Sequence, residues 1–183
     1  MVVCNKLKNI DRDKIKEFWK NRAIGIKDGQ KLTHNDIWQR WLEIELIKRF
    51  IPENSTILDI GCGNGYTTKS IAHIAKDIMG IDFCEEMIKR AKTDYPDVRF
   101  SISDVMCIGP ELFGMFDIAI TERCLINLTS WEDQKKAISN IASVIKEGGL
   151  LLFIEGSKDG RDRLNAMRAS FGLTVMPPVW HNL

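Results

Sequence analysis

Three glycines alternate directly after an apolar run, an arrangement suited to a ligand that carries a nucleoside or an anionic group. The apolar run at 57–60 leads into Gly61, Gly63 and Gly65, and a helical pattern follows at 65–76. Glycine tolerates positive φ and lets a ligand approach the backbone without a Cβ in the way. The new helix end presents unpaired N–H groups and the positive end of its dipole. The sequence therefore predicts a cofactor site at this corner.

Two acidic residues follow the next two predicted strands. Asp82 comes after an apolar run at 78–81, and Asp104 after another at 98–102. A carboxylate at the tip of the second strand can accept hydrogen bonds from both ribose hydroxyls, as in dinucleotide folds. Each residue also has a structural alternative. Asp82 could cap the helix predicted at 84–93, and Asp104 could be a cap or turn residue.

The order of the predicted elements supplies the framework that brings these strand ends together. Strands are predicted at 56–60, 78–81, 98–102, 116–121 and 150–154. Helices are predicted between them at 65–76, 84–93 and 131–146, with a shorter irregular piece near 105–114. The strands are apolar with little alternation, as in sheets covered on both faces. Repeated βα units imply an α/β fold with a doubly wound, mostly parallel sheet and helices on both of its faces.

Residues 1–52 are predicted to form an N-terminal helical lid, and residues 53–183 the cofactor-binding core. A short helix is expected at 11–20, followed by a glycine-containing connection at 21–31. Thr33 and Asp36 have the spacing of a capping box, which would open a helix reaching about residue 50. Its expected apolar stripe consists of Ile37, Trp38, Trp41, Leu42, Ile44 and Ile47. The three tryptophans Trp19, Trp38 and Trp41 are interpreted as core anchors rather than substrate contacts.

The end of the chain leaves the last predicted strand at the edge of the sheet. A helix is predicted at 159–171, and its inward residues are expected to be Leu164, Ala166, Met167 and Phe171. An uncovered apolar edge strand is an aggregation hazard. A second copy of the chain that covers this edge is therefore one expectation, which makes a homo-oligomer the predicted assembly.

Length and composition suit one globular domain. The chain has 183 residues, 44% of them hydrophobic and 28% charged, and a formal net charge of +1. No global field favours nucleic acid or a membrane surface, and no apolar run is long enough for a membrane span. Five scattered cysteines without a C-x-x-C pair and three unpaired histidines predict neither a disulfide framework nor a metal site. A cytoplasmic location is expected.

The segment 57–65 resembles motif I of the class I S-adenosylmethionine-dependent methyltransferases, which have a Rossmann-like fold. That motif has an acidic residue two positions before the first glycine of a G-x-G-x-G turn, here Asp59 before Gly61. The resemblance extends over about 53–156, and the Gly148-Gly149 turn matches the family's entry into its fifth strand. The family's sheet normally continues beyond that strand, so the chain is expected to be truncated at its C-terminus.

The resemblance implies S-adenosyl-L-methionine as cofactor and direct methyl transfer as the reaction. In the family pattern Asp82 binds the ribose, Asp104 accepts a hydrogen bond from the adenine amino group, and Asp59 lies near the methionyl portion. Cys62 is expected to be filler beneath the cofactor. The residues expected to bind the cofactor are Asp59, Gly61, Cys62, Gly63, Gly65, Asp82, Phe83, Met87, Asp104, Val105 and Arg123.

The loop after the fourth strand is expected to face the methyl acceptor. Glu122 is the candidate general base and Asn127 an orienting group, at a place where many relatives carry histidine. Glu122 and Arg123 have a simpler alternative as a solvated surface pair. The lid residues expected over the cofactor are Phe18, Trp19 and Arg22.

Two other functions stay open beside methyl transfer to a small molecule. An NAD(P)-dependent oxidoreductase shares the glycine turn and the acid on the second strand. However, Tyr66 stands where the G-x-G-x-x-G pattern has glycine or alanine. A non-catalytic cofactor- or partner-binding domain is the third interpretation. Nucleic acid is disfavoured as substrate, because no basic stripe with interleaved aromatics is present.

Overall fold

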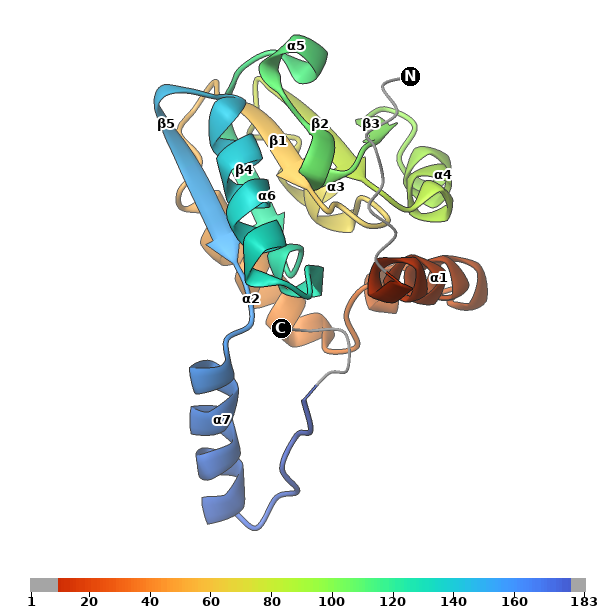
Figure 1. Ribbon diagram of the computed structural model, residues 1–183, viewed down its shortest axis with the longest axis vertical. Coiled ribbons are helices and arrows are strands. Elements are labelled where there is room, and N and C mark those ends of the chain that lie inside the picture. Colours follow the sequence, from red (N-terminus) through yellow and green to blue (C-terminus); the bar gives the residue numbers. More distant parts are fainter. Residues whose placement is uncertain (1–9, 179–183) are drawn as a thin grey trace.

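A computed structural model of the chain describes residues 10–178, with side chains from residue 12, and its centre is a five-stranded parallel sheet (Figure 1). The strand order is β3-β2-β1-β4-β5. The strands are β1 (Thr56–Ile60), β2 (Asp77–Asp82), β3 (Arg99–Ile102), β4 (Phe116–Glu122) and β5 (Ile145–Ile154). The predicted α/β fold is confirmed, and β5 lies at one edge of the sheet, as expected.

Helices cover both faces of this sheet. The α-helices are α1 (Ile10–Gly25), α2 (Ile37–Lys48), α3 (Tyr66–Ile71), α4 (Glu85–Asp94), α5 (Pro110–Phe113), α6 (Trp131–Ser143) and α7 (Lys158–Ser170). Three short 3-10 turns are η1 (Gly29–Lys31), η2 (Val105–Cys107) and η3 (Leu125–Asn127). Helix α6 ends three residues earlier than predicted, because Ile145 already pairs with Phe116 of β4.

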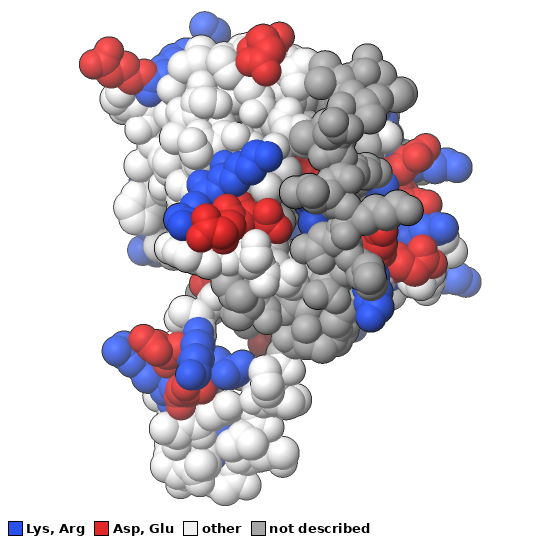
Figure 2. Space-filling view, in the orientation of Figure 1, with Lys and Arg blue, Asp and Glu red and all other residues white. Residues whose placement is uncertain are grey.

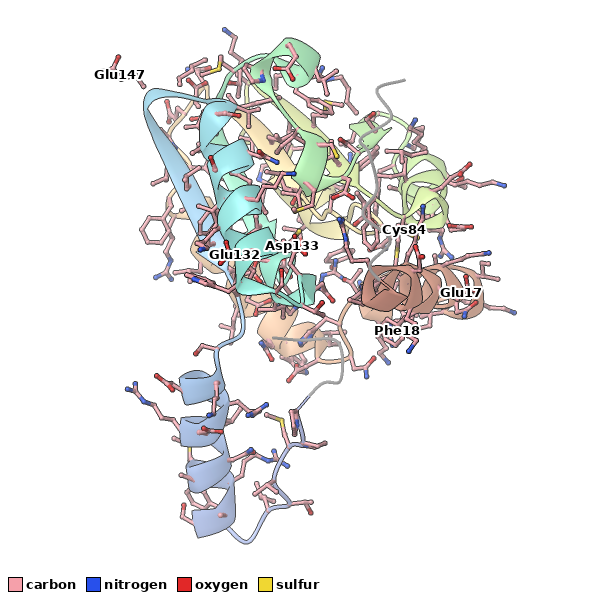
Figure 3. The ribbon with its side chains drawn as sticks, in the orientation of Figure 1. Glu17, Phe18, Cys84, Glu132, Asp133 and Glu147 are labelled. Atoms are coloured by element: carbon pink, nitrogen blue, oxygen red, sulfur yellow. The ribbon has the colours of Figure 1, made fainter. Side chains whose placement is uncertain are left out.

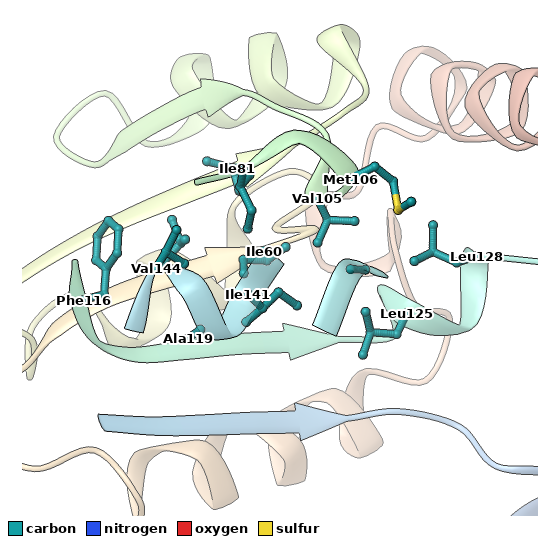
Figure 4. Close-up of a cluster of buried hydrophobic side chains, with 13 residues drawn as sticks. Ile60, Ile81, Val105, Met106, Phe116, Ala119, Leu125, Leu128, Ile141 and Val144 are labelled. Atoms are coloured by element: carbon teal, nitrogen blue, oxygen red, sulfur yellow. The ribbon is translucent and has the colours of Figure 1, made fainter. Parts of the chain in front are cut away.

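Side chains that alternate along the strands build a core on each face. On β1, Ile57 belongs to the cluster under α2, α3 and α4, whereas Leu58 and Ile60 belong to the cluster under α6. Figure 4 shows the second cluster, in which Ile141 of α6 lies over the sheet. Since successive side chains of a strand point to opposite faces, a continuous apolar run fills both cores at once.

Helix α2 packs on the sheet through one side only. Ile44 and Ile47 are buried among the strand residues, but Trp38 and Trp41 are 73% and 56% exposed, and Leu42 is exposed as well. The prediction that these three residues belong to a buried stripe is wrong. A helix turns by about 100° per residue, so the six apolar residues of the predicted stripe are spread over too much of the helix circumference. Only one side of the helix can contact the sheet.

The start of α2 also differs from the prediction. The helix begins after Asp36, whose carboxylate accepts hydrogen bonds from the backbone N–H groups of Trp38 and Gln39, both at 3.0 Å. The cap is therefore a single aspartate at the N-cap position rather than a box opened by Thr33.

Helix α7 forms as predicted but is not buried. It leaves the end of β5 and projects away from the sheet (Figure 1). Leu164, Met167 and Phe171 are 44%, 60% and 76% exposed. The expectation that they point inward is wrong for the described residues, because no described element lies against that side of the helix.

Charged groups of both signs share the surface. On the face in Figure 2, lysine and arginine side chains are interspersed with aspartate and glutamate, also on α7. Within residues 10–178, no helix combines the length and the apolar character that a membrane crossing needs. The same residues contain no group of three or more histidine, cysteine or acidic side chains arranged to hold a metal ion.

Candidate cofactor site

A cavity lies at the carboxyl-terminal edge of the sheet, where the predicted site residues meet. Its own volume is about 40 Å³, and about 450 Å³ of empty space is counted when the open solvent at its mouth is included. The ends of β1, β2, β3 and β4 all contribute to its wall, through Gly61, Asp82, Asp104 and Asn127. In open α/β sheets this edge is where ligands bind, between strands whose connections run to opposite faces.

The glycine turn is shaped by contacts that leave no room for side chains. The backbone N–H groups of Gly61 and Cys62 both donate to the carbonyl oxygen of Ile81, at 2.8 and 3.0 Å. Gly65 has a φ of +76°, and a Cβ there would lie 2.4 Å from the Phe100 ring. The predicted strand–turn–helix corner is present, and the turn is tied directly to the end of β2.

Asp82 is the carboxylate most firmly fixed in the cavity wall. Its Oδ2 accepts a hydrogen bond from the N–H of Gly63 at 2.9 Å, and its Oδ1 accepts one from Cys84 at 2.8 Å. Burial raises the pKa of Asp82 to about 6. Both oxygens retain a lone pair, so the carboxylate can still accept two hydroxyl groups of a ligand. Asp82 does not cap α4, whose N-cap is Cys84.

Asp104 has a structural role and also lines the cavity. Its Oδ1 accepts a hydrogen bond from the N–H of Met106 at 2.9 Å and so caps η2. Its Oδ2 accepts one from Arg12 of α1 at 2.6 Å. Arg12 and Ile15, which also line the cavity, were not foreseen from the sequence, because Arg12 and Asp104 are 92 residues apart.

The N-terminal helix reaches the cavity with residues other than those predicted for the lid. Arg22 instead donates from its Nε to the carbonyl oxygen of Leu32 at 2.8 Å. The rings of Phe18 and Trp19 meet edge to face, 5.1 Å between centroids. Figure 3 shows Phe18 on α1 and Cys84 close to this helix. Whether α1 moves as a lid stays a prediction.

Six predicted cofactor contacts are absent from the cavity lining: Asp59, Cys62, Gly63, Gly65, Met87 and Arg123. Asp59 is buried and accepts a hydrogen bond from the Thr68 hydroxyl at 2.6 Å, and burial raises its pKa to about 7. Cys62 is also buried, and its thiol faces Gly80. Met87 is packed in the cluster that joins α4 to α1. These positions support the wall, and direct contacts with a ligand stay a prediction. Phe83 and Val105 line the cavity itself.

Glu122 and Arg123 are engaged with each other outside the cavity lining. Glu122 accepts a hydrogen bond from the Thr67 hydroxyl at 2.7 Å and pairs with Arg123. Arg123 also pairs with Glu43 of α2, and its φ is +54°. The pair is therefore mostly enclosed and links β4 to two helices, unlike the solvated alternative. The proposed base and cofactor-binding roles of these two residues stay predictions.

Asn127 is one of the residues of this loop that line the cavity. Its Nδ2 donates to the carbonyl oxygen of Arg123 at 2.6 Å, which fixes the orientation of the amide. Its Oδ1 is buried and has no partner among the described residues. A buried polar atom without a partner costs about 1–3 kcal/mol, so a donor that came within reach of this oxygen would stabilise the loop.

Glu155, directly after β5, binds the loop that follows β4, and it was not identified from the sequence as part of the site. Its carboxylate accepts hydrogen bonds from the Thr121 hydroxyl at 2.8 Å and from backbone N–H groups of Cys124 and Leu125, both at 3.1 Å. Burial raises the pKa of Glu155. The available signal was its position directly after a predicted strand, the same signal that identified Asp82.

The parallel sheet with helices on both faces defines a Rossmann-like α/β fold, with a cavity at the carboxyl-terminal edge of the sheet. The profile of the methyltransferase domain family matches residues 57–149, from β1 to the start of β5. The chain therefore belongs to the methyltransferase domain family.

Two relatives show how much of the chain is shared. It is 30% identical over 132 residues to a ubiquinone biosynthesis O-methyltransferase of Xanthomonas axonopodis pv. citri (strain 306), covering 70% of this chain and 51% of that one. It is 32% identical over 117 residues to a malonyl-[acyl-carrier protein] O-methyltransferase of Anoxybacillus flavithermus (strain DSM 21510 / WK1), covering 63% and 44%. The chain thus spans about half the length of the curated relatives that it matches.

Solved structures share the fold at low sequence identity. A DhpI–SAM–HEP complex superposes with a TM-score of 0.69 at 17% identity, covering 95% of this chain and 76% of that one. The N-methyltransferase NodS of Bradyrhizobium japonicum WM9, in complex with S-adenosyl-L-homocysteine, gives a TM-score of 0.65 at 22% identity, covering 75% and 71%.

Proposed function

We propose that this chain binds S-adenosyl-L-methionine and transfers its methyl group to a small molecule. The observation that carries the proposal is the pair of carboxylates, Asp82 and Asp104, that lines one cavity beside the glycine turn. Family membership and the ligands named for the structural neighbours support the same cofactor.

The residues present fit this cofactor. Asp82 is held by two backbone donors at the tip of β2, where a ribose would meet it. Phe83 and Val105 supply apolar surface for a base. At the β4 side, Asn127 lines the cavity with a polar side chain. The cavity therefore has acidic and apolar side chains near β2 and β3 and a neutral polar side chain near β4.

S-adenosyl-L-methionine, when bound, supplies a methyl group on a sulfonium, which is already a good leaving group. The protein's task is therefore to align the acceptor and to exclude water. Ile15 and Leu128 supply apolar side chains to the cavity wall, which would displace water from around a bound ligand. Asn127, at the β4 side of the same wall, is placed to orient an acceptor. Glu122 is the candidate general base. To deprotonate a hydroxyl acceptor, Glu122 would have to be released from its ion pair with Arg123.

Binding to two cofactors separates this function from the oxidoreductase alternative. The folded chain is titrated by calorimetry with S-adenosyl-L-homocysteine and, separately, with NADH. We expect micromolar binding of the former alone. NADH binding alone would contradict the proposal, and binding of neither would favour the non-catalytic, partner-binding alternative.

A variant of the carboxylate at the end of β2 tests the site itself. Asp82→Asn keeps the shape but removes the charge, and charge-assisted hydrogen bonds contribute about 1.5–3 kcal/mol. We expect S-adenosyl-L-homocysteine to bind at least tenfold more weakly. Asp77→Asn, at the opposite end of the same strand, is the matched control and should bind normally. Equal affinity of Asp82→Asn and the unchanged chain would refute the assignment.

A further inference from the structure

The loop between β4 and α6 contains a residue, Arg123, in an unfavourable backbone conformation. Arg123 has a φ of +54°, a region that costs a non-glycine residue of order 1–3 kcal/mol unless its surroundings enforce it. The four residues that follow include Cys124 and Asn127, which line the cavity. Something outside the loop must therefore fix its backbone.

One side chain receives the free donors of this loop. Glu155 Oε1 accepts from the N–H groups of Cys124 and Leu125 and from the Thr121 hydroxyl, and Oε2 accepts from the N–H of Ile126 at 3.2 Å. Four donors thus converge on a single carboxylate. Hydrogen bonds to an ionised acceptor are roughly twice as strong as those between neutral groups.

The other side of the loop is anchored by apolar contacts. Figure 4 shows Leu125 and Leu128 in the cluster with Val105 and Met106. These contacts hold the loop against the core, but they do not orient the Asn127 amide. That orientation follows from the backbone, since Asn127 donates to the Arg123 carbonyl and its own N–H bonds the Cys124 carbonyl at 3.1 Å.

We infer that Glu155 is a positioning residue, which holds the 123–127 backbone so that Asn127 takes its place in the cavity wall, against the bound ligand. The inference rests on the proposed function, because it assigns the cavity to the cofactor and its methyl acceptor. Glu155 itself does not line the cavity and acts through the three backbone amides.

Two variants and a matched control test the inference. Glu155→Ala removes all four acceptor contacts, and Glu155→Gln keeps one oxygen but turns an amide toward the loop donors. Glu147→Gln alters the same strand at its opposite end, where Figure 3 places Glu147, and serves as control. Thermal unfolding of each variant defines a temperature at which all are folded, so that loss of fold is not mistaken for loss of binding.

Two readouts at that temperature decide the matter. Hydrogen exchange of the amides of 124–126 should be at least tenfold faster in Glu155→Ala, without any ligand. Affinity for S-adenosyl-L-homocysteine should fall about tenfold in Glu155→Ala and less in Glu155→Gln, with Glu147→Gln unchanged. Faster exchange with unchanged affinity would reduce Glu155 to a structural residue and overturn the inference, as would unchanged exchange.

A double-mutant cycle shows whether Glu155 acts through Asn127. If it does, Asn127→Ala and Glu155→Ala together should weaken binding of S-adenosyl-L-homocysteine no more than the stronger single variant. Effects that multiply would overturn the route through Asn127. If the unchanged chain itself does not bind S-adenosyl-L-homocysteine, the proposed function fails, and this result is distinct from any difference between variants.

Discussion

Replacing the buried acid Asp59 by asparagine should make the fold more stable at neutral pH. Asp59 lies beneath the glycine turn, and its one hydrogen bond from a side chain comes from the Thr68 hydroxyl at 2.6 Å. Burial raises the pKa of Asp59 from 3.8 to about 7, with smaller contributions from the charges of Glu122 and Asp82. Asparagine keeps an oxygen that can accept the Thr68 hydrogen bond and carries no charge.

The sign and size of the effect follow from proton linkage. Between pH 4 and pH 7 the unfolded chain has lost the Asp59 proton, whereas the native chain still holds it. The free energy of unfolding therefore falls by about 1.4 kcal/mol per pH unit as pH rises, and levels off above pH 7. Over the whole interval the loss from this group is about 4 kcal/mol. Asp59→Asn removes this loss.

Urea unfolding followed by far-ultraviolet circular dichroism measures the effect. Unfolding free energies are compared at pH 5, 6, 7 and 8 for the unchanged chain, Asp59→Asn and the surface control Asp77→Asn. The stability advantage of Asp59→Asn should grow by about 2 kcal/mol between pH 5 and pH 7, since the native Asp59 is half ionised at pH 7. The control should parallel the unchanged chain. Asp82, whose pKa is also raised, is present in all three proteins, so only its electrostatic coupling to Asp59 enters the difference.

A constant difference between the two stability curves across pH 5–7 would refute this reasoning. It would mean that Asp59 ionises in the native state as readily as in the unfolded chain. A less stable Asp59→Asn at pH 8 would mean that the charge itself stabilises the glycine turn.

Two further predictions concern the turn and the N-terminal helix. Gly65→Ala should lower the free energy of unfolding by about 2 kcal/mol or more, because φ is +76° and the new Cβ would meet Phe100 at 2.4 Å. The control Gly25→Ala has open space around the new Cβ and should change the free energy of unfolding by less than about 1 kcal/mol. Urea midpoints check both, and equal losses would contradict the argument. Arg12→Ala should change stability by less than about 1 kcal/mol, since the pair with Asp104 is partly exposed. It should speed S-adenosyl-L-homocysteine dissociation several-fold in stopped-flow experiments, and an unchanged rate would show that Arg12 does not retain the ligand.

The local pattern of the sequence was enough to predict the sheet and the glycine corner. Apolar runs that fill both faces, followed by turn residues, specify parallel strands wherever they occur in the chain. An acid directly after such a run lies at the carboxyl-terminal edge, and the resemblance to the methyltransferases assigned Asp82 and Asp104 to one cofactor site. These features depend on residues that are close in sequence.

Contacts between distant segments were decided only by the tertiary structure. Arg12 meets Asp104 across 92 residues, and Glu155 reaches back across about 30 residues to the loop after β4. The same packing engages Arg123 with Glu43 of α2 and leaves Trp38 exposed on that helix. The periodicity of a sequence predicts whether a side chain is buried or exposed, but it does not identify the residues that the side chain will contact. Which groups become partners is fixed only when the sheet order and the helix crossings bring separate segments together.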